Sequence, residues 1–98
     1  MGFEYRAAVE SQLKPAALNK IRELLKRSSL FEMLDNGNPD QILFRWCSHP
    51  LNPTWPEDAM ITLEENYIYL VIHGATGTER DALIGEISGN LGVGFQEI

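Results

Sequence analysis

The sequence lacks several features that would assign it to a broad class of proteins. It has a single cysteine, Cys47, so no disulfide can form within the chain, and this favours a reducing, cytoplasmic location. No apolar run approaches the roughly 18 residues that a membrane-spanning helix needs. The first ten residues show no basic segment followed by an apolar core, so we expect no signal peptide. We therefore predict a small soluble, cytoplasmic protein without a membrane segment.

Positive charge is also scarce, especially in the second half of the chain. The net charge is −6. Residues 1–56 hold seven bases and six acids, for a net charge of +1, whereas residues 57–98 hold one base and eight acids, for a net charge of −7. Neutralising the phosphates of a nucleic acid requires a net basic surface. The acidic balance therefore argues against nucleic acid as a partner.

No complete nucleotide-binding motif is present, although the stretch GATGT that begins at Gly74 has the appearance of one. It follows a strand-like run and precedes a helix-like segment, as a phosphate-binding loop does. The lysine of a P-loop is missing, and the two glycines are three residues apart. Glu79 and Asp81 would repel a phosphate from the first helical turn. We interpret the stretch as a corner in which Thr78 caps the helix and Asp81 closes the capping box.

What the sequence does contain is the composition and periodicity of one α+β domain over residues 1–98. Alternating apolar residues indicate strands, and apolar residues three or four apart indicate helices. Strands are expected at residues 3–10, 41–48, 59–64, 67–73 and 93–98, and helices at residues 15–27 and 78–90. Leu30, Phe31 and Leu34 could continue the first helix beyond its two serines.

The expected element order is β-α-β-β-β-α-β. Two right-handed β-α-β crossovers place both helices on one face of a single sheet. The resulting fold is a two-layer α+β sandwich, similar in pattern to the ferredoxin-like fold or a close variant of it.

The strand at residues 67–73 suggests a surface for interaction. Tyr67 and Tyr69 share one face of this strand, and the aliphatic residues between them are expected to lie under the helices. The tyrosine face stays open in a two-layer sandwich, and it is partly apolar if Phe44 and Trp46 do not both point to the helices. Apolar open faces usually mark interfaces. We therefore predict a non-enzymatic protein-interaction or regulatory module, with Tyr67, Tyr69, Trp46 and Trp55 as its interaction residues.

The partner of such a module is either a second copy of the chain, which gives a homodimer, or a different protein. The alternative function is a small-ligand-binding domain or small enzyme with its site near the loop from Trp46 to Trp55. Cys47, His49 and His73 are the candidate residues of that site.

The chemistry around Cys47 is incomplete in the sequence. A metal site needs three or four converging ligands, and a cysteine nucleophile needs a base within hydrogen-bond reach. Cys47 and His49 supply two groups, and no spacing in the chain requires His73, Glu57 or Asp58 to join them. We therefore assign no catalytic residue, no metal and no cofactor, and lean against an enzyme.

Overall fold

The computed structural model describes residues 3–9, 14–34, 37–50 and 56–98, which form a six-stranded sheet and two helices. In chain order the elements are β1 (Phe3–Ala8), α1 (Lys14–Arg27), β2 (Phe31–Leu34), β3 (Gln41–Trp46), β4 (Ala59–Leu63), β5 (Tyr67–Ile72), α2 (Gly77–Leu91) and β6 (Gln96–Glu97). The prediction of an α+β fold is confirmed.

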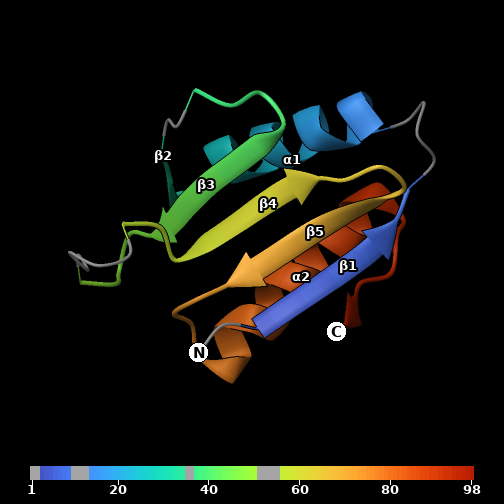
Figure 1. Cartoon of the computed structure of the whole chain (residues 1–98). Coiled ribbons are helices and arrows are strands. Elements are labelled where there is room, and N and C mark those ends of the chain that lie inside the picture. Colours follow the sequence, from blue (N-terminus) through green and yellow to red (C-terminus); the bar gives the residue numbers. More distant parts are fainter. Residues whose placement is uncertain (1–2, 10–13, 35–36, 51–55) are drawn as a thin grey trace.

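The sheet is antiparallel throughout, in the order β2-β3-β4-β5-β1-β6. Strands β2 to β5 follow one another as a meander, and β1 pairs with β5 from Phe3 opposite Ile72 to Ala8 opposite Tyr67. Both helices lie on one face, behind the sheet in the view of Figure 1, and the other face carries no helix. The two-layer arrangement is therefore as predicted.

The element order differs from the prediction by one strand. Phe31 and Leu34, whose spacing could have continued the first helix, belong to β2, and Phe31 lies opposite Trp46 of β3. The helix ends at Arg27, and the Ser28 hydroxyl accepts a hydrogen bond from the Leu30 amide just after it. The backbone of these residues forms hydrogen bonds with β3 in place of those of a further helical turn. The ferredoxin-like order is thus not confirmed.

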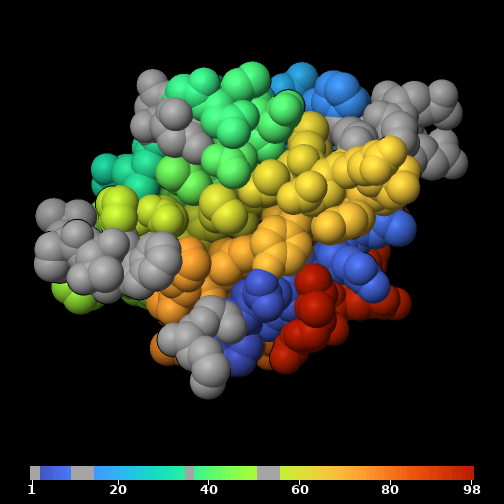
Figure 2. Space-filling view, viewed as in Figure 1, coloured from blue at the N-terminus to red at the C-terminus, as the bar shows by residue number. Residues whose placement is uncertain are grey.

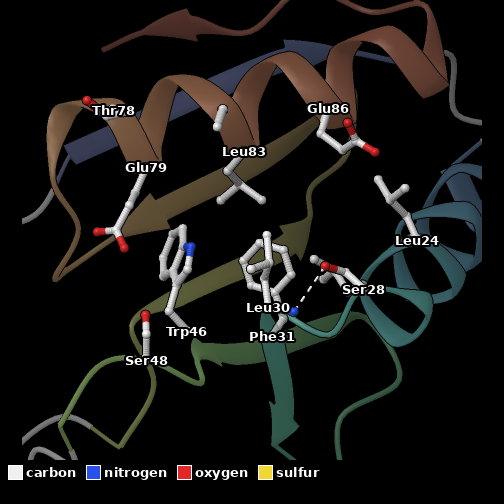
Figure 3. A pocket seen from close by; sticks show the side chains of 12 residues that line it. Leu24, Ser28, Leu30, Phe31, Trp46, Ser48, Thr78, Glu79, Leu83 and Glu86 are labelled. Carbon is white, nitrogen blue, oxygen red and sulfur yellow. Dashed lines mark hydrogen bonds between the residues drawn. The ribbon is translucent and has the colours of Figure 1, made fainter.

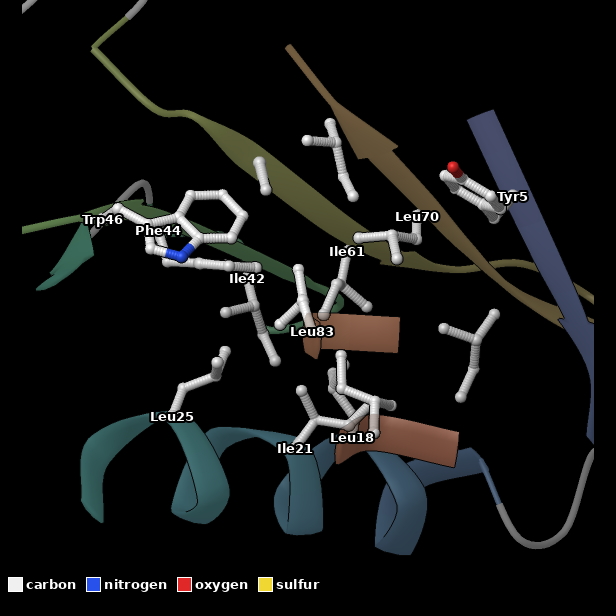
Figure 4. Packing of buried hydrophobic residues seen from close by; sticks show 14 residues of the cluster. Tyr5, Leu18, Ile21, Leu25, Ile42, Phe44, Trp46, Ile61, Leu70 and Leu83 are labelled. Carbon is white, nitrogen blue, oxygen red and sulfur yellow. The ribbon is translucent and has the colours of Figure 1, made fainter. Parts of the chain in front are cut away.

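The core lies between the sheet and the helices, as Figure 4 shows. Alternate aliphatic residues of β5 point into it, as predicted, and they are fully buried with side chains from the neighbouring strands. Helix α1 contributes Leu18, Ile21 and Leu25, and α2 contributes Leu83 and Ile87. This apolar stripe along each helix is what holds it against the sheet.

The N-cap of helix α2 lies two residues before the predicted one. Thr76 is the N-cap: its hydroxyl accepts a hydrogen bond from the Glu79 amide, and the Glu79 carboxylate accepts one from the Thr76 amide at 2.9 Å. The capping box predicted for Thr78 and Asp81 was wrong, because a glutamate three residues after Thr76 reaches back better than an aspartate can. Neither α1 nor α2 is long and apolar enough to cross a membrane.

Candidate functional site

The structure separates the residues that were predicted to form one interaction surface. Tyr67 and Tyr69 lie on the open face of the sheet, on the opposite side from the core residues of β5. Trp46 is only 5% exposed and belongs to the core under the helices, as does Phe44. Trp55 lies outside the described residues. We expected Phe44 and Trp46 to make the open face partly apolar only if they did not both point to the helices. Both do point to the helices, so they add nothing to the open face.

Figure 2 shows the molecule from the side of the open face. This face carries polar contacts between neighbouring strands around a short apolar row. The Tyr69 hydroxyl donates a hydrogen bond to the Glu4 carboxylate, and this bond, reinforced by burial, raises the pKa of Tyr69 to about 12. The Arg6 guanidinium lies 5.9 Å from the centre of the Tyr67 ring. Both tyrosines thus have contacts within their own sheet.

The apolar row crosses four strands of the open face at one level. Strand register places its members side by side, and we call the set the open-face row: Leu34, Leu43, Met60 and Val71. Each of these side chains is largely or partly buried by its neighbours. The row is therefore a narrow apolar band rather than a broad patch.

A concave site lies on the other side of the sheet, between the two helices. It is a pocket of about 430 Å³, which we call the α1–α2 pocket, and Figure 3 shows its side chains. Its lining is mostly apolar, with hydroxyls and two carboxylates among the apolar side chains: Leu24, Leu25, Ser28, Leu30, Phe31, Trp46, Ser48, Thr78, Glu79, Ala82, Leu83 and Glu86.

The sheet side of the pocket is built from packed aromatic rings. The rings of Phe31 and Trp46 lie 5.3 Å apart, and Phe31 meets Phe44 edge to face at 5.4 Å. Because β2 and β3 are hydrogen-bonded neighbours, these rings come from adjacent strands. Packed rings of this kind have little freedom to rotate, so the wall is formed before any ligand arrives.

His49 fixes the edge of the pocket where α2 begins. Its Nδ1 atom lies 3.0 Å from an Asp58 carboxylate oxygen, and its Nε2 atom lies 2.9 Å from a Glu79 carboxylate oxygen. The imidazole also stacks on the Trp46 ring, with 5.3 Å between centres and 24° between planes. In its doubly protonated form, this ring donates to both carboxylates.

Both carboxylates are also held by the backbone. Asp58 accepts a hydrogen bond from the Trp46 amide at 2.9 Å, and Glu79 accepts the one from Thr76 described above. The Thr76 bond lowers the pKa of the Glu79 carboxyl, with His49 acting in the same direction and burial opposing it. The contacts from Asp58 through His49 to Glu79 therefore connect the end of β3 and the start of β4 to the first turn of α2.

The three candidates of the alternative site have different surroundings. Cys47 is exposed, and its amide donates to the Leu30 carbonyl. Both ring nitrogens of His49 already face carboxylates, so neither is placed to activate the Cys47 thiol. His73 lies 4.0 Å from Glu57 instead. Within the described ranges, no group of three or more His, Cys, Asp and Glu side chains is arranged to hold a metal ion.

Sequence reasoning placed Trp46 and His49 in one candidate site, named Asp58 only as a group that no spacing requires there, and missed Glu79 and Glu86. Asp58 is nine residues from His49, and Glu79 is thirty residues away, so no short motif joins them. One signal was available on α2. Glu79, Leu83 and Glu86 follow the spacing that puts side chains on one side of a helix.

Comparison of the chain with protein-family models, with curated proteins and with solved structures finds no match. The geometry of the α1–α2 pocket and of the open face is therefore the basis for any statement about function.

Proposed function

We propose that this protein is a small-ligand-binding domain and that its ligand occupies the α1–α2 pocket. The observation that carries the proposal is the pocket itself: a mostly apolar hollow of about 430 Å³ with an aromatic wall and a few polar groups at fixed positions. Sites for small molecules usually have this composition and a volume of roughly 300–1,000 Å³.

The aromatic wall and the Glu79 carboxylate of the pocket are held in place by contacts within the protein. Trp46 is held by ring contacts on one side and by the stacked His49 on another, and His49 in turn fixes the Glu79 carboxylate. Leu30, at 62% exposed, is among the most exposed large apolar residues of the described chain, and it lines the pocket. A ligand that covers Leu30 removes apolar surface from water, at little cost in reorganising the aromatic wall.

A thermal-shift screen of small apolar and amphipathic compounds tests this proposal. A ligand at ten times its dissociation constant adds about 1.4 kcal/mol to the free energy of unfolding. For a domain of this size, the gain corresponds to a rise of about 5–10 °C in Tm. Hits are then measured by isothermal titration calorimetry.

A pair of variants on α2 decides whether a hit occupies the pocket. Ala82 is exposed and lines the pocket, so Ala82→Trp fills its mouth and should abolish binding. Asp81 is exposed on the same helix and does not line the pocket, so Asp81→Trp should leave binding intact. Equal binding by both variants would place the ligand elsewhere and remove the proposal.

The open face supports a second candidate function, self-association into a homodimer through the open-face row. On strands β1 to β5, this face carries two acids, Glu4 and Glu32, and two bases, Arg6 and Arg45. The charges of these strand residues thus sum to zero, although the chain has a net charge of −6. Two copies can bring these faces together without the repulsion that their net charge creates elsewhere.

Light scattering on a gel-filtration column tests the dimer. Leu43→Glu places a charge in the open-face row and should convert a dimer into a monomer. Asn90→Glu adds the same charge at an exposed position of α2 and serves as the control. A wild-type protein that is monomeric at about 0.5 mM would remove this candidate, because a specific dimer of even modest affinity forms at that concentration.

A further inference from the structure

We infer that the ligand of the α1–α2 pocket is a cation, an amine attached to an apolar or aromatic body. This inference rests on the proposed function and adds the charge of the ligand to it. It comes from the charge of the groups that line the pocket, taken together with its apolar and aromatic walls.

The described lining contains two carboxylates and no lysine or arginine. Glu79 and Glu86 both extend from α2 on the side that faces the pocket, with Leu83 between them (Figure 3). The two glutamates are seven positions apart, which is roughly 10 Å along a helix axis. The basic residues at the end of α1, Lys26 and Arg27, are exposed and do not line the pocket.

The negative charge is only partly neutralised within the described residues. Asp58 and Glu79 share one imidazole, that of His49, so this cluster has a net charge of −1 even when the ring is protonated. Glu86 has no salt bridge to a described residue and is exposed at the pocket. With Glu86 included, the net charge of these groups is −2 with a protonated His49 and −3 with a neutral one.

The aromatic wall favours the same class of ligand. Trp46 and Phe31 line the pocket together with the two glutamates. A cation near an aromatic face gains roughly 0.5–2 kcal/mol from the ring's charge distribution, and an anion does not. An amine with an apolar body can therefore place that body against the leucines of the pocket and its ammonium group between the aromatic rings and Glu86.

Three probes with one body and different head groups test the charge: 4-phenylbutylamine, 4-phenylbutanol and 4-phenylbutanoate. Isothermal titration calorimetry at low salt should rank them amine first, alcohol second and carboxylate last. The preference for the amine over the alcohol should shrink as sodium chloride is raised, because the head group is partly exposed and its attraction to Glu86 is screened.

Glu86→Gln isolates the unpaired carboxylate. The affinity for 4-phenylbutylamine should fall roughly two- to five-fold, as expected for one exposed charge pair, and the affinity for 4-phenylbutanol should not change. Asp81→Asn removes an acid from the same helix outside the pocket, and it should change neither affinity. Glu86→Gln leaves the capping box of α2 intact, so loss of folding does not confuse the comparison.

The outcomes separate this inference from the proposed function. If 4-phenylbutanol or 4-phenylbutanoate binds as tightly as the amine, and Ala82→Trp abolishes that binding, the pocket is a ligand site but the inferred charge is wrong. If an amine preference exists but survives Glu86→Gln undiminished, the assignment to Glu86 is wrong. If none of the three binds and the compound screen also gives no hit, the proposed function fails and the inference fails with it.

Discussion

The two faces of the sheet are built from the same strands, yet they differ in what their side chains do. On β5, Ile68 and Leu70 are fully buried against the helices, whereas Tyr67 and Tyr69 on the alternate positions face outward and contact groups of β1. The helix side leaves a hollow next to packed aromatic rings, and on the open face the two tyrosines contact charged groups of the neighbouring strand. Aromatic content alone therefore does not locate a site; the packing around each ring does.

The largest expected difference between the two faces is in stability. Phe44 and Leu43 are adjacent in β3 and point to opposite sides, with Phe44 fully buried and Leu43 half-buried. Phe44→Ala should lower the free energy of unfolding by about 3–5 kcal/mol because it leaves a cavity in the core. Leu43→Ala should cost less than about 1.5 kcal/mol, since less apolar surface is lost. Urea unfolding followed by circular dichroism measures both, and equal losses would contradict the division between the faces.

A second comparison concerns the two histidines. His49→Ala removes contacts to two carboxylates and a ring stack, so we expect a loss of about 1–3 kcal/mol. His73→Ala removes a longer contact to Glu57 and should cost under about 1 kcal/mol. Urea unfolding at pH 6 compares the variants. If His73→Ala lowers the free energy of unfolding as much as His49→Ala does, the contacts of His49 with Asp58 and Glu79 add little stability.

The lowered pKa of Glu79 predicts an acid-dependent loss of stability on the helix side. The folded state favours the ionised carboxyl, so this contribution is fully present above the ordinary value of 4.5 and is lost as the pH falls through the lowered pKa. Wild type should therefore be more stable than Glu79→Gln at pH 7, and the gap should close toward pH 3. Urea unfolding from pH 3 to 7 measures the gap. If the difference in unfolding free energy between wild type and Glu79→Gln stays constant with pH, the lowered pKa of Glu79 is contradicted.

The open face should show the opposite kind of titration, with a small effect. The pKa of Tyr69 is raised to about 12, so its contribution to stability is fully present below pH 10 and is lost as the pH rises through 12. Ultraviolet titration of the folded protein should show one tyrosine that ionises late, and Glu4→Gln should return it toward the ordinary value. Tyr69→Phe should cost about 1 kcal/mol or less. If Tyr69 of the wild type ionises near pH 10, this result would contradict the hydrogen bond from Tyr69 to Glu4.

The parts of the fold that the sequence predicts well are those set by local periodicity. The alternation of β5 places its aliphatic residues under the helices, and the apolar spacing of α2 gives the helix to within one residue at each end. Strand β2 could not be read in this way, because Phe31 and Leu34 also fit the helical spacing and only pairing with β3 decides between the two. Trp46 shows the same limit: alternation says which neighbours share its face but not which face the helices cover.

The candidate site was only half predictable for a related reason. Trp46 and His49 are close in the chain, and their residue types suggested a ligand site. Asp58, Glu79 and Glu86 come from other elements, and they join the site only because the sheet packs against α2. No separation along the chain encodes that contact.

The pairing of β1 with β5 has a consequence for how the chain folds. Phe3 lies opposite Ile72, so β1 pairs with residues that are nearly seventy positions later in the sequence. The meander from β2 to β5 needs only short-range closures and can form first, since closing a longer loop costs more chain entropy. We therefore expect β1 to dock late, which makes the meander with its helix-side core the nucleus around which the rest of the molecule assembles.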